Sequence, residues 1–496
     1  MDNSHPVVAY IGQAAWAFVN PHFSEYAKGV LSKLITFVEV SIRIGDSIIP
    51  TPDAPPPATS PLSLSPCGPS PSGFTSNTDE CMPAEKLFHD QISTDPKTRW
   101  KSYPQVIEDL KEKAKKQGLW MLWANKVQYP EMSAGLTNLE YAVMAEIMGH
   151  AIRIAPEATN SSAPDTGNME VLARYGSAEQ KERWLKPLIA GKIRSSFAMT
   201  EFGIASSDAT NIRTSIVLDE KTNEIVVNGH KWWISGAGDP RNEIHIVMGK
   251  SDPKADKYHQ QSIVLVPSNT PGVKLVRPMQ VFGYDDAPEG HYEVKYENVR
   301  VPASNLVLGW GRGFEIIQGR LGPGRLHHCM RSLGLASRSL DLALLRATDE
   351  RKKTFGKSLF QHGKVVSDLA ESRIEIDQSR LLVLAAALVV DKHPERAKGA
   401  LREIGMAKAL VPTTVLRIID RAMQLHGAEG ICQDQPLASM WAGVRTLRYA
   451  DGPDEVHLDQ LGRTELKRVP VVREKYARVQ KREEELTKNS RTSSKL

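Results

Sequence analysis

The chain has 496 residues, 41% hydrophobic and 24% charged, which is enough for two or three globular domains. Its net charge of +5, with no dense Lys/Arg block among aromatic residues, argues against nucleic-acid binding. The cysteines lie too far apart for a CxxC metal pattern, and no apolar run is long enough to span a bilayer. We therefore expect a globular protein with no metal site and no membrane span.

The N-terminal part combines an apolar helical pattern with a low-complexity stretch. Leu31, Leu34, Ile35, Phe37 and Val38 have helical spacing, which predicts a helical segment within residues 1–49. Residues 50–80 are rich in Pro, Ser and Thr and have no hydrophobic period, so we expect this segment to be disordered.

Residues 81–195 carry the signals of a helical domain. An amphipathic stretch covers 103–118 and ends at Gly118, a typical C-cap. Apolar residues at helical spacing over 136–149 predict a second helix. The run Ser177-Ala-Glu-Gln180 is a capping pattern that opens a third, reaching Leu188.

The hydrophobic period then changes twice. Within 196–305, short alternating or apolar runs between turn residues predict strands at 224–229, 244–248, 262–267 and 291–296. Within 306–470 the pattern is helical again, with long helices predicted at 314–350, 365–391, 397–425 and 436–449. The order helices, strands, helices indicates an α+β multidomain fold.

Residues 471–496 form a charged tail that ends in Ser494-Lys495-Leu496. A terminal Ser-Lys-Leu is read by the peroxisomal import receptor, and the polar stretch Thr487–Ser494 before it is expected to be flexible. These features predict a peroxisomal location.

The first motif with chemical meaning covers Phe197–Asp208 and is followed by Trp232-Trp233-Ile234-Ser235-Gly236. Small residues and hydroxyls leave backbone N–H groups accessible to a polar ligand, and an indole can cover a flat ring. Composition alone favours a β-domain with a buried Trp pair and a Ser-rich loop.

The second motif is Asp451-Gly452-Pro453, which follows a basic-apolar helical stretch. The Gly-Pro pair predicts a sharp turn between two helices, with the acid on the turn. A carboxylate fixed at a helix junction can face a cleft and act as a base.

Together these motifs resemble the acyl-CoA dehydrogenase family. The resemblance covers about 81–468, plus 31–39, and is strongest to a branch with an Asp base in which some members carry a fused kinase-like domain. No kinase motif occurs here. The resemblance implies an N-terminal helical domain, a middle β-domain and a C-terminal four-helix bundle. It also makes 41–80 an insertion, which is either a genuine loop or the translation of an unspliced intron.

The resemblance further implies FAD and an acyl-CoA substrate. Ser206 or Ser207, together with Gly452, matches positions that contact the substrate, and both serines stay open. The sequence Lys352-Lys-Thr-Phe355-Gly matches a segment that reaches the flavin diphosphate of a neighbouring subunit, so a homodimer or homotetramer is expected. The positions matched to flavin contacts are Phe197, Met199, Thr200, Trp233, Ile234, Ser235, Arg351, Lys352, Phe355, Gln424, Gly427, Pro453 and Glu455.

The same match assigns the catalytic base to Asp451, with Arg325 in a supporting role. Some family members carry the base as a Glu at the position of Gly324, which cannot serve here. We expect exclusion of water to raise the pKa of the base toward neutrality. His327, His328 and His457 are interpreted as structural.

The expected activity is formation of an α,β double bond in an acyl-CoA, in fatty-acid β-oxidation or in tailoring of a secondary metabolite. The electron acceptor, an electron-transfer flavoprotein or O2, stays open. A peroxisomal acyl-CoA oxidase that uses O2 is the nearest alternative, and a non-catalytic flavin-binding relative is a more distant one. Chain length and substitution of the acyl group stay open.

Overall fold

The computed structural model describes residues 7–38, 80–392 and 400–493. The predicted disordered segment 50–80 lies outside these ranges except for Glu80, and so does the tripeptide Ser494–Leu496. Peroxisomal import therefore stays a prediction. Among the described residues, no helix combines the length and apolar character needed to cross a membrane.

The N-terminal part is helical, and its predicted caps are present. Gly118 ends α4 with a left-handed φ of 73°, and Ser177 forms a capping box with Gln180. An additional helix, α1, was not predicted. The helices are α1 (Val8–Val19), α2 (Glu25–Val38), α3 (Cys81–Gln91), α4 (Gln105–Gln117), α5 (Asn138–Met148), α6 (Ala155–Ala158), α7 (Asp165–Tyr175), α8 (Ala178–Gln180) and α9 (Lys186–Ile189).

The middle part is a seven-stranded sheet with the order β1-β4-β2-β3-β7-β6, and β5 pairs with β4. Alternating residues of the long strands β3 and β7 are buried, as the period-2 pattern predicts. The strands are β1 (Arg194–Ala198), β2 (Ser215–Asp219), β3 (Glu224–Ser235), β4 (Asn242–Lys250), β5 (Gln261–Pro267), β6 (Val273–Pro278) and β7 (His291–Pro302).

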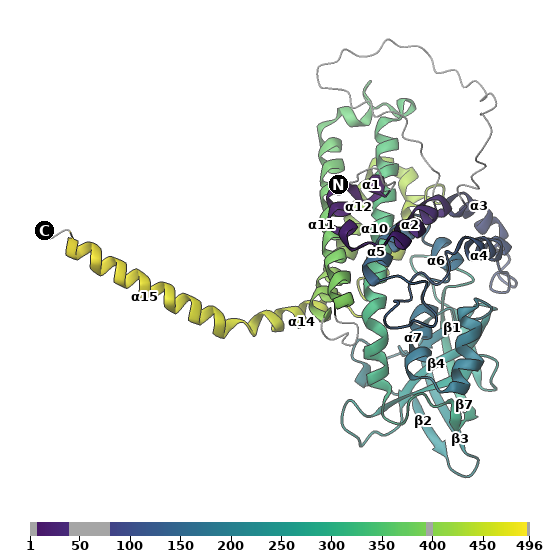
Figure 1. Cartoon of the computed structure of the whole chain (residues 1–496). Coiled ribbons are helices and arrows are strands. Elements are labelled where there is room, and N and C mark those ends of the chain that lie inside the picture. The colour runs from purple at the N-terminus through teal and green to yellow at the C-terminus, as the bar shows by residue number, and fades with distance from the viewer. Residues whose placement is uncertain (1–6, 39–79, 393–399, 494–496) are drawn as a thin grey trace.

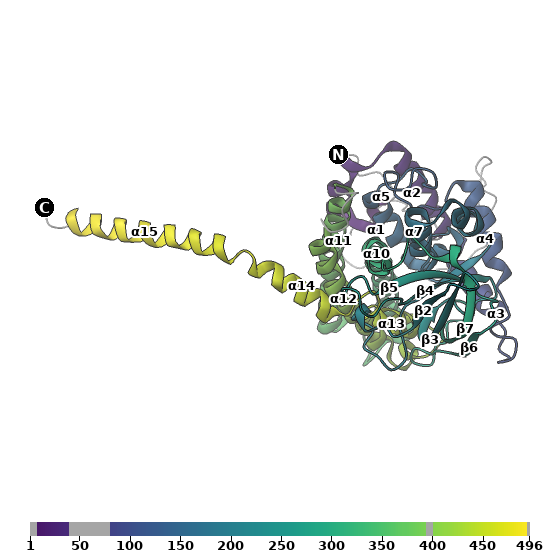
Figure 2. The same ribbon diagram turned by 90° about the horizontal axis from the view of Figure 1, so that it is seen from below.

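The C-terminal part is a bundle built around the long helices α10 (Gly313–Thr348), α11 (Gly363–Lys392) and α12 (Leu401–His426). Helix α5 packs against α10 and α11 (Figure 1), and helix α13 (Leu437–Thr446) and helix α14 (Asp454–Leu466) pack against α12 (Figure 2). The helical domains thus share one hydrophobic core. The four predicted long helices are present, and their ends differ from the predicted ones by a few residues at most.

The tail differs from the expectation. Residues 469–493 form one helix, α15 (Val469–Ser493), so the prediction of a flexible stretch from Thr487 is wrong as far as Ser493. Side chains three or four residues apart pair along it, as Arg478 does with Glu474 and Arg482 with Glu485, which supports a helix. Figures 1 and 2 show α15 running away from the body of the molecule.

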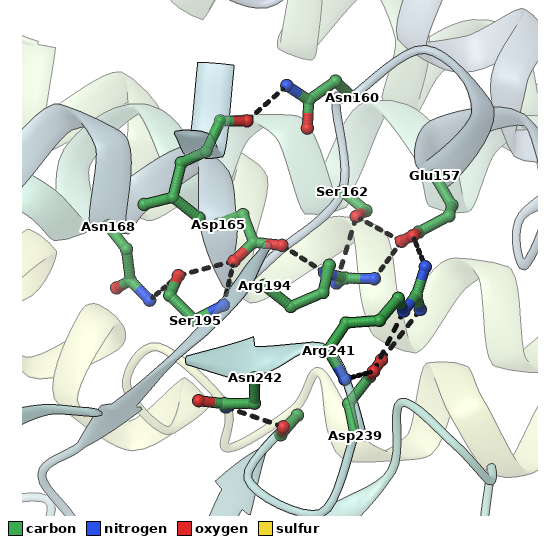
Figure 3. Close-up of polar contacts among 12 residues, drawn as sticks. Glu157, Asn160, Ser162, Asp165, Asn168, Arg194, Ser195, Asp239, Arg241 and Asn242 are labelled. Carbon is green, nitrogen blue, oxygen red and sulfur yellow. Dashed lines mark hydrogen bonds and ion pairs between the residues drawn. The ribbon is translucent and has the colours of Figure 1, made fainter. Parts of the chain in front are cut away.

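A buried ionic network holds the N-terminal helices against the sheet (Figure 3). Arg194, the first residue of β1, donates to Glu157 of α6 and to Asp165 of α7. Arg241, just before β4, donates to Glu157 at 2.9 Å and pairs with Asp239 at 2.8 Å. Because buried charges are costly unless paired, this network fixes the position of β1 relative to the helices.

Candidate active site

Asp451 lies on the turn between α13 and α14, as predicted. Its φ is +56° and that of Gly452 is +108°. Both values lie in the left-handed region, which residues other than glycine rarely adopt. Pro453 then caps the start of α14 in an extended conformation. Such a backbone persists only when its surroundings fix it.

Side chains from three helices hold this turn. Arg325 Nε of α10 donates to the Asp451 carbonyl oxygen at 2.7 Å. The fully buried Lys408 of α12 donates to the Leu447 carbonyl, at the end of α13. On the other side, the His457 ring of α14 packs so closely against Gly452 that a Cβ there would lie 3.0 Å from Nε2. The turn is therefore rigid, and Gly452 cannot carry a side chain without displacing His457.

The Asp451 carboxylate faces α10. Its Oδ2 lies 3.4 Å from His328 Nε2, and the side chain is 23% exposed. A Cβ on Gly324 would lie 4.0 Å from the same oxygen, so the position at which some family members carry the base opens onto the same site. His328, interpreted from the sequence as structural, thus lies beside the candidate base. His327, one residue earlier, packs edge-on against Tyr141 in the core.

The pKa of Asp451 is shifted in the direction opposite to the one expected from the sequence. Burial raises its pKa, but the adjacent His328 ring and the positive charges of Arg320 and Arg325 outweigh it and hold the pKa below the usual range of an aspartate. Burial also lowers the pKa of His328. In the protein without substrate, Asp451 is therefore ionised and His328 is a neutral donor at neutral pH.

Replacing His328 tests this assignment. We expect His328→Leu to raise the pKa of Asp451, because the ring whose Nε2 lies 3.4 Å from Oδ2, and which helps to lower that pKa, is lost. The acidic limb of the pH profile of kcat/KM should then move to higher pH. His328→Gln keeps an N–H donor and is the matched control. An unchanged acidic limb in the Leu variant would remove His328 from the site.

Phe197 and Asp451 are linked by a residue that the sequence did not single out. The Arg320 guanidinium lies over the Phe197 ring at 4.1 Å, and its Nε donates to Asn168 Oδ1 at 3.3 Å. Asn168 in turn donates to Ser195 of β1, within the network of Figure 3. Arg320 also interacts electrostatically with Asp451. A lone Arg in a helix carries no sequence signal for this role.

The residues matched to flavin contacts in the β-domain gather at a bulge. Trp233 has a φ of +57° where the register between β3 and β7 shifts, and this leaves its indole 37% exposed. Ser235 Oγ lies 2.9 Å from His291 Nδ1, and Thr200 donates to the Trp232 carbonyl at 2.5 Å. Ile234 points into the core, where it is 1% exposed.

A buried ion pair between Lys231 and Glu201, close to this bulge, was not predicted from the sequence. Lys231 Nζ donates to the Met199 carbonyl and to Glu201, each at 2.8 Å. Glu201 accepts from the backbone at Arg213 and Thr214, so it fixes the loop that follows β1.

The two candidate serines differ. Ser206 Oγ accepts from the Glu201 N–H at 3.0 Å and is partly buried, whereas Ser207 is exposed. The structure places both on the loop after β1 and Met199, beside the bulge at Trp233.

The remaining matched residues form a second group at the far end of α10. Lys352 Nζ pairs with Glu429 at 3.2 Å, next to Gly427, and Gln424 lines a cavity of about 460 Å³ between α10, α11 and α12. Arg351 and Phe355 are exposed, Phe355 by 94%. At 1.5 Å per residue, Arg325 and Thr348 lie about 35 Å apart along α10, so the two groups do not line one pocket within a single chain. Glu455 is exposed on the first turn of α14.

Three models of the acyl-CoA dehydrogenase domains match the chain in the order of its architecture. The N-terminal domain matches residues 84–192, the middle domain 196–299 and the C-terminal domain 311–466. The chain belongs to the acyl-CoA dehydrogenase family. The expected fold, with a helical, a β and a helical domain, is confirmed.

Related acyl-CoA dehydrogenases come from plants, animals and bacteria. "Probable acyl-CoA dehydrogenase IBR3" of Arabidopsis thaliana is 51% identical over 409 residues, covering 78% of this chain and 48% of that protein. Acyl-CoA dehydrogenase family member 11 of Gallus gallus is 51% identical, with 77% and 48% covered. "Probable acyl-CoA dehydrogenase FadE2" of Mycobacterium tuberculosis is 51% identical, with 74% and 86% covered. The chain thus spans about half of the first two relatives and most of the third.

Solved acyl-CoA dehydrogenase structures share the architecture. One from Mycobacterium abscessus assigned to the family is 41% identical with a TM-score of 0.77, covering 90% of this chain and 99% of that one. Butyryl-CoA dehydrogenase of Megasphaera elsdenii, at 23% identity and a TM-score of 0.64, covers 77% and 94% and shows the fold alone. The same holds for the FAD complex of PigA, at 20% identity and 0.63, with 77% and 92% covered.

Proposed function

We propose that this acyl-CoA dehydrogenase family member uses FAD to form an α,β double bond in an acyl-CoA, with Asp451 as the base. The observation that carries the proposal is the placement of Asp451. Its carboxylate is fixed at the α13–α14 junction, is ionised by its surroundings, and faces the same part of α10 that reaches Phe197 through Arg320.

The part of the β-domain around Trp233 has features that suit flavin binding. The bulge at Trp233 turns a flat indole outward where a core tryptophan would be buried, and the nearby hydroxyls of Thr200 and Ser235 are bonded to Trp232 and His291. When bound there, FAD supplies the two-electron acceptor for the hydride that leaves the β-carbon.

Asp451 would take the α-proton of the thioester. Its low pKa keeps the carboxylate deprotonated before substrate binds, and the rigid turn holds its oxygens in one position. An aspartate reaches one methylene less far than the glutamate of most family members, so the substrate must approach this turn closely. The His328 ring, with Nε2 3.4 Å from Oδ2, limits the positions open to the carboxylate.

The second residue group supports an oligomer. The residues of this group lie near the C-terminal end of α10, too far from Asp451 to reach a flavin beside it in their own chain. They are Arg351, Lys352, Phe355, Gln424 and Gly427. They would instead contact the flavin of a neighbouring subunit in a homodimer or homotetramer.

The proposal is tested by adding acyl-CoA esters of different length and substitution to the purified flavoprotein without oxygen. Bleaching of the flavin absorbance by at least one ester is expected, and the ester that bleaches fastest identifies the substrate class. Absence of bleaching with every ester would contradict the dehydrogenase assignment and favour a non-catalytic flavin-binding role.

The electron acceptor is tested separately. If the enzyme passes electrons to an electron-transfer flavoprotein, turnover in air without an added acceptor should release little hydrogen peroxide. Stoichiometric peroxide would assign it as an acyl-CoA oxidase.

A further inference from the structure

Helix α15 presents a surface that the family architecture does not explain. The C-terminal domain match ends at residue 466, and α15 begins at Val469. Every residue from 466 to 489 is exposed, and the two views show the helix leaving the body of the molecule (Figures 1 and 2). Most of the stability of helices in proteins comes from packing an apolar face, and among the described residues none covers the apolar face of α15.

Most of its exposed large apolar residues form one stripe. Val469, Val472, Tyr476, Val479 and Leu486 are spaced by three, four, three and seven residues, which is the a/d repeat of a coiled coil. Val471 is also exposed and lies off the stripe, at a c position of the first turn, so beyond that turn the large apolar residues are confined to the narrow a/d seam. A narrow a/d seam is the pattern of a helix that packs against another helix, whereas in-plane membrane helices bury a broader apolar face.

The charged residues beside the stripe indicate which kind of partner helix is complementary to α15. The e and g positions that flank the seam carry Arg473, Lys475 and Arg482, with Arg468 one turn earlier, and no acidic residue. Two copies of α15 would offer no acidic e or g residue opposite these cations in either orientation, and in a parallel pair Arg468 of one copy would face Arg473 of the other. An anionic bilayer is disfavoured by the run Glu483-Glu484-Glu485. The complementary partner is a helix with acidic flanks.

We propose that α15 is a docking helix that forms a coiled-coil pair with an amphipathic helix of another protein, one whose flanking positions are acidic. Glu483 falls on an a position of the seam and calls for a cation opposite it in the partner, which would set the register of the pair. This interaction is independent of the proposed catalysis, because α15 lies outside the residues that build the active site.

The test uses the full chain and defined probes. A synthetic helix with Leu at a and d, Glu at e and g, and one Lys opposite Glu483 should bind, and its affinity should fall as salt rises because exposed charges are screened. The same peptide with Lys at e and g should not bind. Vesicles of phosphatidylcholine and phosphatidylserine, and the protein itself at rising concentration, are the competing occupants.

Two variants with the same change of charge separate the seam from general electrostatics. Val479→Asp should weaken binding of the acidic helix about tenfold or more, since it places a carboxylate in an apolar contact. Ala477→Asp, two residues away and off the stripe, should change it far less. Equal effects of the two variants, vesicle binding without peptide binding, or self-association lost in a chain truncated at Leu466 would each overturn the proposal. Acyl-CoA turnover should be unchanged in both variants.

Discussion

Asp451→Asn should retain its flavin absorbance and lose turnover by about 10²- to 10⁴-fold, the usual contribution of a positioned general base. The amide keeps the size of the side chain and its place on the turn, where Arg325 bonds the backbone and not the carboxylate. Flavin spectra and steady-state kinetics with a bleaching acyl-CoA measure the effect.

Two further variants sharpen this prediction. Asp459→Asn removes one negative charge from an exposed position of α14 and should leave turnover unchanged. Adding Gly324→Glu to Asp451→Asn should restore part of the rate, because a side chain at 324 starts 4.0 Å from Asp451 Oδ2 in otherwise open space. If Asp451→Asn turns over at the wild-type rate, Asp451 is not the base.

Arg194→Met should destabilise the protein strongly. The substitution leaves Glu157 and Asp165 buried with one partner fewer, and removing one member of a buried charge network costs about 3–5 kcal/mol (Figure 3). Since Ser195 and Phe197 follow on the same strand, loss of flavin affinity is expected to accompany the lower melting temperature.

The matched control is Arg463→Met. Arg463 pairs with Asp459 at 2.7 Å on the surface of α14, where ion pairs contribute about 0–1 kcal/mol. Thermal unfolding followed by tryptophan fluorescence compares the two variants. A melting temperature of Arg194→Met equal to that of Arg463→Met would show that the network of Figure 3 does not hold β1 against the helices.

The low pKa of Asp451 also makes the free energy of unfolding depend on pH. Its pKa in the folded protein lies below the ordinary value, so the ionised form is favoured by folding. The corresponding stabilisation is present above the pKa of the unfolded chain and is lost as pH falls through the lower, folded value.

The sequence by itself determined the architecture and the candidate for the base. Hydrophobic periods located the long helices and the strands because each element buries one regular face, and the capping residues Gly118 and Ser177 marked helix ends because they satisfy backbone groups locally. The Asp-Gly-Pro turn placed Asp451 at a helix junction because only a few residue types adopt that backbone.

Only the tertiary structure decided the surroundings of that base. His328, Arg320 and Lys408 lie 123, 131 and 43 positions from Asp451 in the sequence, and no local pattern distinguishes them from other residues of buried helices. Packing of α10 against the turn brings the His328 ring and the charges of Arg320 and Arg325 close to the Asp451 carboxylate, which lowers its pKa instead of raising it as expected. Lys408 of α12 instead holds the backbone at the end of α13. Long-range contacts of this kind depend on how helices pack, which a linear pattern does not encode.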